Sequence, residues 1–571
     1  MAEPLNRRAF IARGAMAATA GLAAPLLQSC AHPARTASTV PSGPFQPSWD
    51  SLQQYRVPEW FRDAKFGFWA HWGPQCQPER GDWYARMMYV EGSSQYRDHL
   101  ARYGHPSKAG FKDVIHEWKA EHWDPGALVS HYRRVGAQYF FALANHHDNL
   151  DLWDSRFQPW NSVGVGPRKN IIGGWARAAR ANGLPFGVSL HASHAWSWYE
   201  PAQGADREGS LAGVPYDGKL TKADGAAQWW EGLDPQDLYA QSHRPADGFQ
   251  DPNSIGPRWA WGNGATPPDE AYCRKFLDRT VDLIDRYEPD LVYFDDTALP
   301  FWPVNDMGLR IAAHYYNRSL RRHHGSLQAV LFGKILDERQ RQCMVWDIER
   351  GQANQILPFP WQTDSCIGNW HYDRALYEQD RYRSAETVVR MLVDIVSKNG
   401  NLLLNIPVRG DGTLDDKELR VLDGIEAWMR VNRDSILGSR PWRVFGEGPA
   451  LQGAALTAEG FNEGGGRPFT AEDIRFTTRG ERLYAIALGW PEGGRLVVKS
   501  LAEGTPDAGE IRSVRLLGNP GDLRWSRDRV GLAVQLPATP PCDYAYAIEV
   551  TGLTGGQTAA VCRGGLEWSR E

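Results

Sequence analysis

Residues 291–296, Leu-Val-Tyr-Phe-Asp-Asp, form a short apolar run that ends in two carboxylates. The run 343–349, Cys-Met-Val-Trp-Asp-Ile-Glu, ends in Glu349, and the run 139–147, Tyr-Phe-Phe-Ala-Leu-Ala-Asn-His-His, ends in two histidines. Each run has the length of a buried strand. In a barrel of parallel strands, the carboxyl ends of different strands meet at one mouth, where such folds carry out their chemistry. Two carboxylates at this mouth, with histidines and tryptophans nearby, indicate sugar chemistry.

Apolar runs of this kind alternate with amphipathic segments between residues 56 and 436, a pattern that predicts a (β/α)8-like TIM barrel. We expect its strands at 66–70, 138–144, 186–191, 291–295, 329–334, 343–348, 360–364 and 401–406. Helices are expected at 171–182, 272–287 and 419–432. Residues 200–268 are rich in Gly, Pro, Asp and Trp and lack periodicity, so we expect an insert over the mouth that shapes the substrate site.

Residues 437–571 follow a different pattern, with the domain junction expected at 437–442. Short alternating runs, separated by Gly, Asp and Pro, are typical of an antiparallel β-sandwich. They lie at 474–478, 482–489, 494–500, 513–517, 532–535 and 544–549. Cys542 and Cys562 are candidates for a disulfide in this domain, and buried free thiols are the alternative.

The overall composition excludes several classes of protein. The 63 Lys and Arg residues nearly balance the 68 Asp and Glu residues, giving a net charge of −5, so we expect no nucleic-acid partner. The cysteines are widely spaced and form no CxxC pair, which argues against a metal cage. The 25 tryptophans offer flat apolar faces that stack on sugars, although a Trp-rich core is the alternative. We expect no cofactor.

The N-terminal segment has the features of an export signal. Residues 6–11, Asn-Arg-Arg-Ala-Phe-Ile, resemble a twin-arginine motif, and residues 15–27 are too short for a stable membrane span. Residues 27–30, Leu-Gln-Ser-Cys, resemble a bacterial lipobox, which would place a lipid on Cys30. We expect a signal over 1–30, a flexible tether over 31–55, and a periplasmic or outer-membrane-anchored lipoprotein; cleavage without a lipid is the alternative.

The segment 60–73, Trp-Phe-Arg-Asp-Ala-Lys-Phe-Gly-Phe-Trp-Ala-His-Trp-Gly, resembles the opening of the α-L-fucosidases of glycoside hydrolase family 29. Further blocks resemble that family in the same order, namely 146–155, 289–295, 401–413, 440–449 and 473–491. The resemblance implies a retaining, exo-acting enzyme that removes terminal α-L-fucosyl residues from oligosaccharides or polysaccharides by double displacement. A glycosidase for another L-sugar, such as an α-L-galactoside, is the alternative.

The resemblance also implies the catalytic residues. Asp295 matches the family nucleophile, while Asp296 should point to the opposite side of the strand. Gln362 stands where many members have Glu, and an amide cannot donate and recover a proton. We therefore expect Glu349 to be the acid/base, with Asp364 as the alternative. Each assignment has an alternative. Asp295 could instead be a helix cap or surface acid, and Glu349 could merely pair with Arg350 or a neighbouring Lys. The substitution at Gln362 also leaves open a catalytically impaired, carbohydrate-binding lipoprotein.

The expected sugar-binding residues also come from the resemblance. Three histidines match family residues that hold sugar hydroxyls as neutral imidazoles, and a Trp-Tyr pair matches aromatic residues that face the methyl group of a 6-deoxy sugar. An aspartate stands where the family usually has Glu. His191 lies in a segment, Ser189-Leu190-His191, that departs from the family pattern, and we expect it to replace a usual contact. The full set is His71, Asp82, Trp83, Tyr84, His146, His147, His191 and Trp370.

A metal-dependent hydrolase is the rival class of enzyme, because His71, His146, His147 and Asp295 are all types of metal ligand. The sequence has neither an HxH nor an HExxH pattern. Adjacent histidines on one strand also point to opposite sides, so His146 and His147 should not share an ion. We therefore expect no metal ligands among the site residues.

Overall fold

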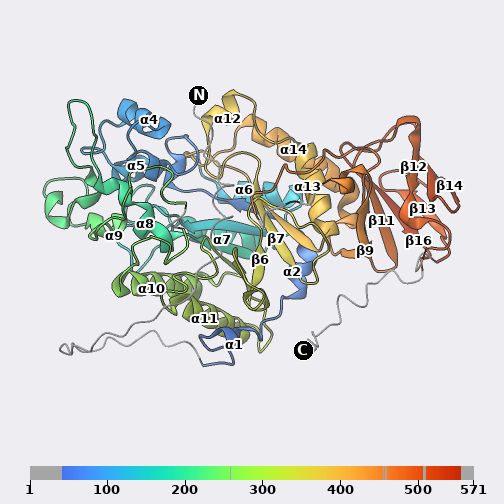
Figure 1. The fold of residues 1–571 in the computed structure, drawn as a ribbon, viewed down its shortest axis with the longest axis horizontal. Helices are drawn as coiled ribbons and strands as arrows, with labels where there is room; N and C mark the ends of the chain where they lie inside the picture. Colours follow the sequence, from blue (N-terminus) through green and yellow to red (C-terminus); the bar gives the residue numbers. More distant parts are fainter. Residues whose placement is uncertain (1–41, 257–258, 454–455, 457–459, 506–508, 554–571) are drawn as a thin grey trace.

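The structure is a computed structural model that describes residues 42–256, 259–453, 456, 460–505 and 509–553 (Figure 1). The predicted disulfide partner Cys562 and the predicted lipid site Cys30 lie outside these residues. A barrel surrounded by helices occupies one side of the molecule, and antiparallel sheets occupy the other. Within the described residues, no helix combines the length and the apolar character that a membrane crossing requires.

The barrel is closed, and its eight parallel strands are hydrogen-bonded in sequence order, with β8 beside β1. The strands are β1 (Phe66–Ala70), β2 (Tyr139–Asn145), β3 (Phe186–Leu190), β4 (Leu291–Phe294), β5 (Val330–Gly333), β6 (Val345–Asp347), β7 (Trp361–Cys366) and β8 (Gly400–Asn405). All of their residues are buried, because helices cover the outside and side chains fill the interior. The predicted barrel is confirmed strand by strand, with ends that differ by one or two residues.

Gln362 lies inside this barrel and is fully buried. Its amide Nε2 donates to Oδ2 of Asp347 at 2.6 Å, and its Oε1 accepts from the hydroxyl of Tyr139 at 2.9 Å. Both polar ends of the amide are therefore satisfied within the protein, so this residue acts as a structural link between β2, β6 and β7.

The helices pack around the barrel (Figure 1). The longer ones are α4 (Ser94–Arg102), α5 (Phe111–Glu117), α6 (Pro125–Val135), α7 (Ile171–Ala181), α10 (Glu270–Tyr287), α11 (Met307–Arg322), α13 (Ala385–Ser397) and α14 (Asp416–Asn432). Short helices are α1 (Trp49–Leu52), α2 (Glu59–Ala64), α3 (Tyr84–Met87), α8 (Ala195–Trp198), α9 (Pro235–Tyr239) and α12 (Arg374–Glu378). The three predicted helices are confirmed. Two of them begin two or three residues early because Asp269 and Asp415 cap their first turns.

The insert 200–268 contains only short helical pieces among its described residues. Its Trp259 and Trp261 stack on the ring of His194, with ring centroids 4.0 and 4.6 Å apart. Nε2 of His194 in turn lies 3.2 Å from Oδ1 of Asp296. Trp259 also reaches the mouth, with its centroid 5.1 Å from that of His147. Asp296 therefore faces the residues that anchor the insert.

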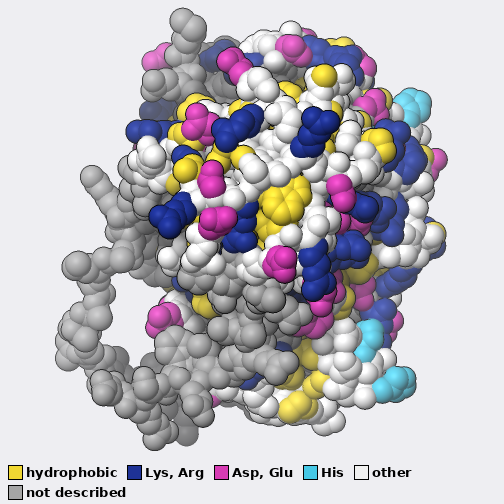
Figure 2. Space-filling view, turned by 90° about the vertical axis from the view of Figure 1, so that its right-hand side faces the viewer, with side chains coloured by type: hydrophobic (Ala, Val, Ile, Leu, Met, Phe, Trp, Pro, Cys, Tyr) yellow, Lys and Arg dark blue, Asp and Glu magenta, His cyan; other side chains and the backbone are white. Residues whose placement is uncertain are grey.

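The C-terminal part contains a five-stranded sheet, β13-β16-β11-β10-β9, and a three-stranded sheet, β12-β15-β14. The bounds are β9 (Arg440–Glu447), β10 (Ile474–Arg479), β11 (Arg482–Ala487), β12 (Arg495–Val498), β13 (Ser513–Leu516), β14 (Arg524–Arg527), β15 (Leu532–Gln535) and β16 (Tyr546–Thr551). The predicted antiparallel sandwich is confirmed. The prediction omitted β9 and β14, because these strands are largely half-buried or exposed and lack a clear apolar alternation. On the face shown in Figure 2, Lys and Arg side chains are interspersed with Asp and Glu.

A buried cluster of charges joins the two domains. Oδ1 of Asp394, on α13, accepts from Nε of Arg475 on β10 at 2.6 Å, and its Oδ2 accepts from Nζ of Lys398 at 2.6 Å. Burial alone would raise the pKa of Asp394, but the two cations outweigh it and lower the pKa.

Asp394→Ala should destabilise the protein by about 3–5 kcal/mol, because two buried cations lose their counter-charge. A lower midpoint in thermal and urea unfolding would show this effect. Asp416→Ala, which breaks an exposed pair with Arg420, is the matched control and should leave the midpoint unchanged. Equal midpoints for wild type and Asp394→Ala would contradict the assignment.

Candidate active site

A polar pocket opens at the carboxyl ends of the barrel strands, where the sequence predicted the site. It is lined by Trp69, His71, Asp82, Trp83, His146, His191, Tyr293, Asp295, Lys334, Glu349, Asp364, Trp370 and His371. Most of the predicted site residues are therefore brought together. Tyr84 is absent from this lining; it is fully buried, and its hydroxyl lies 3.0 Å from Nδ1 of His99. His147 approaches the pocket through its contact with Asp295.

Asp295 follows β4 directly and is surrounded by hydrogen-bond donors. Its Oδ1 accepts from Nζ of Lys334 at 2.5 Å, and its Oδ2 lies 3.0 Å from Nδ1 of His191 and 3.1 Å from Nε2 of His147. Burial alone would raise the pKa of Asp295, but Lys334 and the two imidazoles outweigh it and hold the pKa well below its usual range. The carboxylate is therefore ionised at neutral pH, as a nucleophile must be.

Lys334 bridges the two predicted catalytic carboxylates. Its Nζ lies 2.5 Å from Oδ1 of Asp295 and 2.5 Å from Oε2 of Glu349. These two contacts limit the separation of the carboxylate oxygens to at most about 5 Å, the spacing found in retaining glycosidases. Burial would lower the pKa of Lys334, but the two carboxylates raise it above the usual value, so the ammonium stays charged.

Glu349 lies two residues beyond β6 and is held beside β7, because the N–H of Arg350 donates to the carbonyl oxygen of Asp364 at 2.8 Å. Its predicted alternative role, pairing with a neighbouring cation, is partly seen: Lys334 contacts it, whereas the Arg350 guanidinium contacts Glu463. The Glu349 side chain remains 14% exposed to the pocket.

Asp364 is more deeply placed, with only 1% of its surface exposed. Its Oδ2 accepts from the hydroxyl of Tyr293 at 2.9 Å. Burial and the neighbouring Asp347 raise the pKa of Asp364 well above its usual range, and burial raises the pKa of Asp347 to about 7. Both carboxyls therefore hold their protons more tightly than an exposed aspartate does.

Four of the histidines at the pocket are neutral at physiological pH, because burial lowers the pKa of His71, His146 and His191, and that of His147 to about 4. The ring of His147 lies between Oδ2 of Asp295 and the carbonyl oxygen of His191, at 3.1 and 2.7 Å. A neutral ring has one proton for these two acceptors. Neutral imidazoles suit the recognition of sugar hydroxyls, because each ring can donate through one nitrogen and accept through the other.

Sequence reasoning missed Lys334 and His371. Lys334 is the last residue of the predicted strand 329–334, so a charged residue at the end of an apolar run was the available signal. The Oδ1 atom of Asp82 accepts from the backbone N–H of His371 at 2.8 Å and lies 3.3 Å from its Nδ1. No local pattern indicated this contact, because the two residues lie 289 positions apart.

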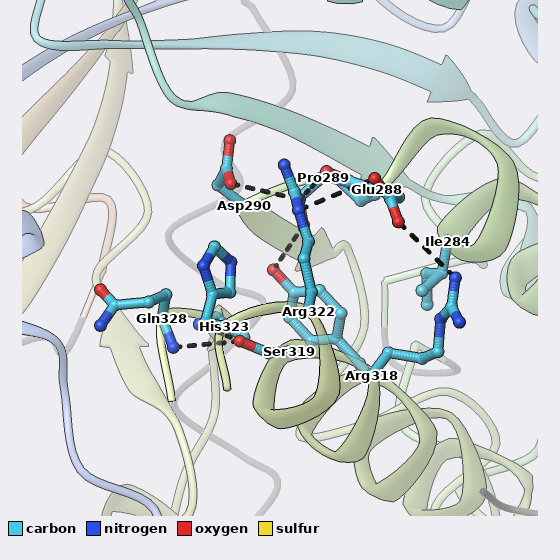
Figure 3. A pocket seen from close by; sticks show the side chains of 11 residues that line it. Ile284, Glu288, Pro289, Asp290, Arg318, Ser319, Arg322, His323 and Gln328 are labelled. Atoms are coloured by element: carbon cyan, nitrogen blue, oxygen red, sulfur yellow. Dashed lines mark hydrogen bonds and ion pairs between the residues drawn. The ribbon is translucent and has the colours of Figure 1, made fainter. Parts of the chain in front are cut away.

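A second cavity lies near the amino end of β4, away from the mouth (Figure 3). Figure 3 shows Arg322 between Asp290 and Glu288; its Nη1 donates to the carbonyl oxygen of Glu288 at 2.7 Å and lies 3.5 Å from Oδ1 of Asp290. These charges satisfy one another. A position at the amino ends of barrel strands is associated with stability rather than chemistry.

An eight-stranded parallel barrel with two bridged carboxylates at its mouth is the architecture of a glycoside hydrolase. The family model described as Alpha-L-fucosidase matches residues 33–434, and the model described as Alpha-L-fucosidase C-terminal domain matches residues 467–551. The chain belongs to the α-L-fucosidase family and has the activity of an α-L-fucosidase.

Relatives and solved structures agree with this assignment. Tissue alpha-L-fucosidase of Homo sapiens is 24% identical over 533 residues, covering 89% of this chain and 92% of that protein. Alpha-L-fucosidase of Branchiostoma floridae is 23% identical, covering 89% and 96%. The fold is similar to that of Thermotoga maritima alpha-fucosidase, with a TM-score of 0.61, 23% identity and coverage of 89% and 100%. It is also similar to isoenzyme 1 from Paenibacillus thiaminolyticus, with a TM-score of 0.57, 21% identity and coverage of 88% and 99%.

The buried carboxyl of Asp148 provides a test of the electrostatics around the pocket. Burial raises its pKa to about 6, although hydrogen bonds from the N–H of Leu150 and the amide of Gln75 partly offset this rise. The unfolded chain releases this proton near pH 4, so the folded state should lose stability as pH rises from about 4 to about 6. Asp148→Asn removes the titration. The unfolding free energy of this variant relative to wild type should therefore increase by roughly 2–3 kcal/mol between pH 4 and pH 7.

Urea unfolding of both proteins across this pH range measures the difference. A constant difference between the two proteins would show that the Asp148 carboxyl titrates normally.

Proposed function

We propose that the chain removes terminal α-L-fucosyl residues from glycans by double displacement, with Asp295 as nucleophile and Glu349 as acid/base. One observation carries this proposal. Lys334 contacts Oδ1 of Asp295 and Oε2 of Glu349 at 2.5 Å each, which limits the distance between these two oxygens to at most about 5 Å. An inverting enzyme needs a wider separation, roughly 6.5–9.5 Å, to admit a water molecule between sugar and base.

In the first step, protonated Glu349 gives its proton to the glycosidic oxygen while a carboxylate oxygen of Asp295 attacks the anomeric carbon. The bond to the leaving group breaks, and a covalent fucosyl-enzyme forms. In the second step, ionised Glu349 takes a proton from water, the water oxygen attacks the anomeric carbon, and the bond to Asp295 breaks. Lys334 stabilises the negative charge on Asp295 before the attack and again when the carboxylate is released.

Glu349 is favoured over Asp364 by access to substrate. The Glu349 side chain is exposed to the pocket beside the cation that also contacts Asp295. Asp364 is nearly fully buried and accepts a hydrogen bond from the hydroxyl of Tyr293. A general acid must reach the leaving oxygen within hydrogen-bond distance, which a carboxyl directed to interior partners does not do.

Asp295→Asn should lower kcat/KM for an aryl α-L-fucoside by several orders of magnitude, because an amide cannot form the covalent intermediate. Glu349→Gln should lower it strongly for natural glycans and less for an aryl substrate, whose leaving group needs little protonation. Steady-state release of the aryl group and of fucose measures both effects.

The matched controls are Asp296→Asn, next to the nucleophile but facing His194, and Asp364→Asn. In both variants, kcat/KM should depend on the leaving group in the same way as in the wild type. If instead Asp364→Asn lost activity mainly on natural glycans while Glu349→Gln kept the wild-type dependence, the acid/base assignment would be reversed.

We also propose that residues 1–30 direct twin-arginine export and that a lipid on Cys30 tethers the enzyme in the bacterial envelope. The arginine pair at 7–8 and the Leu-Gln-Ser-Cys sequence at 27–30 support this proposal. Cys30→Ala should move fucosidase activity from the membrane fraction to the soluble periplasmic fraction. An unchanged distribution would contradict a lipid at this residue, while loss of export in Arg7→Lys/Arg8→Lys would separately support the signal.

A further inference from the structure

Three histidines from adjacent strands meet on one wall of the pocket. His71 follows β1, His146 follows β2 and His191 follows β3. The ring centroid of His71 lies 5.2 Å from that of His146 and 5.0 Å from that of His191, and the last two are 5.0 Å apart. One ring nitrogen from each residue lies within 4.8 Å of the other two. Barrel topology therefore gathers three imidazoles that are far apart in the sequence.

Several nitrogens of this group lack partners. Among the described residues, neither ring nitrogen of His71 has a hydrogen-bond partner, and nor does Nε2 of His191. The two residues are only 4% and 2% exposed. Buried polar atoms in native proteins are almost always hydrogen-bonded or bound to an ion or ligand, so these nitrogens point to a ligand in the pocket.

The hydrogen bonds made by Nδ1 of His191 and of His146 determine whether the other ring nitrogen, Nε2, can bind a cation. Nδ1 of His191 donates to Oδ2 of Asp295 at 3.0 Å, which leaves the lone pair on Nε2, and such carboxylate–histidine contacts are typical of metal-ligating imidazoles. Nδ1 of His146 accepts from Nε2 of Gln75 at 2.6 Å. Binding of a cation at Nε2 of His146 therefore requires the Gln75 amide to turn over, so that its Oε1 accepts from Nδ1. This turn gives up the hydrogen bonds of the amide with Oδ2 of Asp148 and with the N–H of Ala85.

We propose that His71, His146 and His191 bind a divalent transition metal ion of the zinc type, and that this ion inhibits the enzyme by occupying the place of the sugar hydroxyls. Neutral imidazole is a preferred ligand of such ions, and three histidines leave a fourth tetrahedral position open. The inhibitory part rests on the proposed function of the pocket. The sequence argument against a metal rested on the absence of HxH and HExxH patterns and on the opposite directions of His146 and His147. The structure adds His191 from the neighbouring strand, so that the group no longer needs His147.

Isothermal titration of the mature chain with zinc chloride tests the binding directly, without any activity measurement. We expect one strong site per chain, and we expect His71→Asn and His191→Asn each to weaken it by roughly 100-fold or more. The matched control is His131→Asn, in the group formed by His131, Asp423 and Glu426. It should leave the strong site unchanged. Thermal unfolding of every variant identifies any loss of binding that comes from loss of the fold.

Cobalt chloride supplies a second measurement, because a tetrahedral site gives intense visible absorption bands that should disappear in folded His191→Asn. Saturating L-fucose should weaken zinc binding at least about tenfold if both ligands occupy the same place. The inference is overturned if wild type binds no zinc, if only His131→Asn removes the binding, or if fucose and zinc bind independently. Absence of zinc binding in an enzyme that Asp295→Asn inactivates would contradict this inference and leave the proposed function intact.

Discussion

The ammonium group of Lys334, placed between Asp295 and Glu349, is the interaction on which the active site depends. Two carboxylates at this distance repel each other when both are ionised. The shared cation offsets that repulsion and keeps Asp295 ionised, and the contact geometry fixes the spacing that double displacement needs. Removing or moving this charge would therefore change the surroundings of the nucleophile and of the acid/base, as well as the distance between them.

The surrounding barrel separates carboxyls of similar sequence context into different roles. Asp295 faces Lys334 and two imidazoles, while the adjacent Asp296 faces His194 and helps anchor the insert. Glu349 is partly exposed to the pocket, while Asp347 lies buried in the interior, where burial raises its pKa. Asp295 and Asp296 differ because successive side chains along a strand point to opposite sides. Glu349 and Asp347 differ because they lie at different depths in the barrel.

The apolar runs predicted all eight barrel strands, because strands buried on both faces need nearly continuous apolar sequence. The strands β9 and β14 could not be predicted in this way, since side chains at a sheet edge or surface are under no such constraint. Most pocket residues were predicted from the family resemblance, and several of them, such as Asp295, His146 and Glu349, also lie at or just beyond strand ends. Two features could not be predicted: the side chain of Tyr84 points away from the pocket to His99, and Asp82 contacts His371. Both depend on the course of the connections between strands, which the local sequence does not define.

The stereochemistry of the first released sugar tests the central claim most directly. Proton NMR during hydrolysis of an aryl α-L-fucoside, recorded before the anomers equilibrate, distinguishes α-L-fucose from β-L-fucose. Carboxylates that share the Lys334 cation at most about 5 Å apart predict that α-L-fucose appears first, with net retention. Initial release of β-L-fucose would show direct attack by water and would contradict the role of Asp295 as nucleophile.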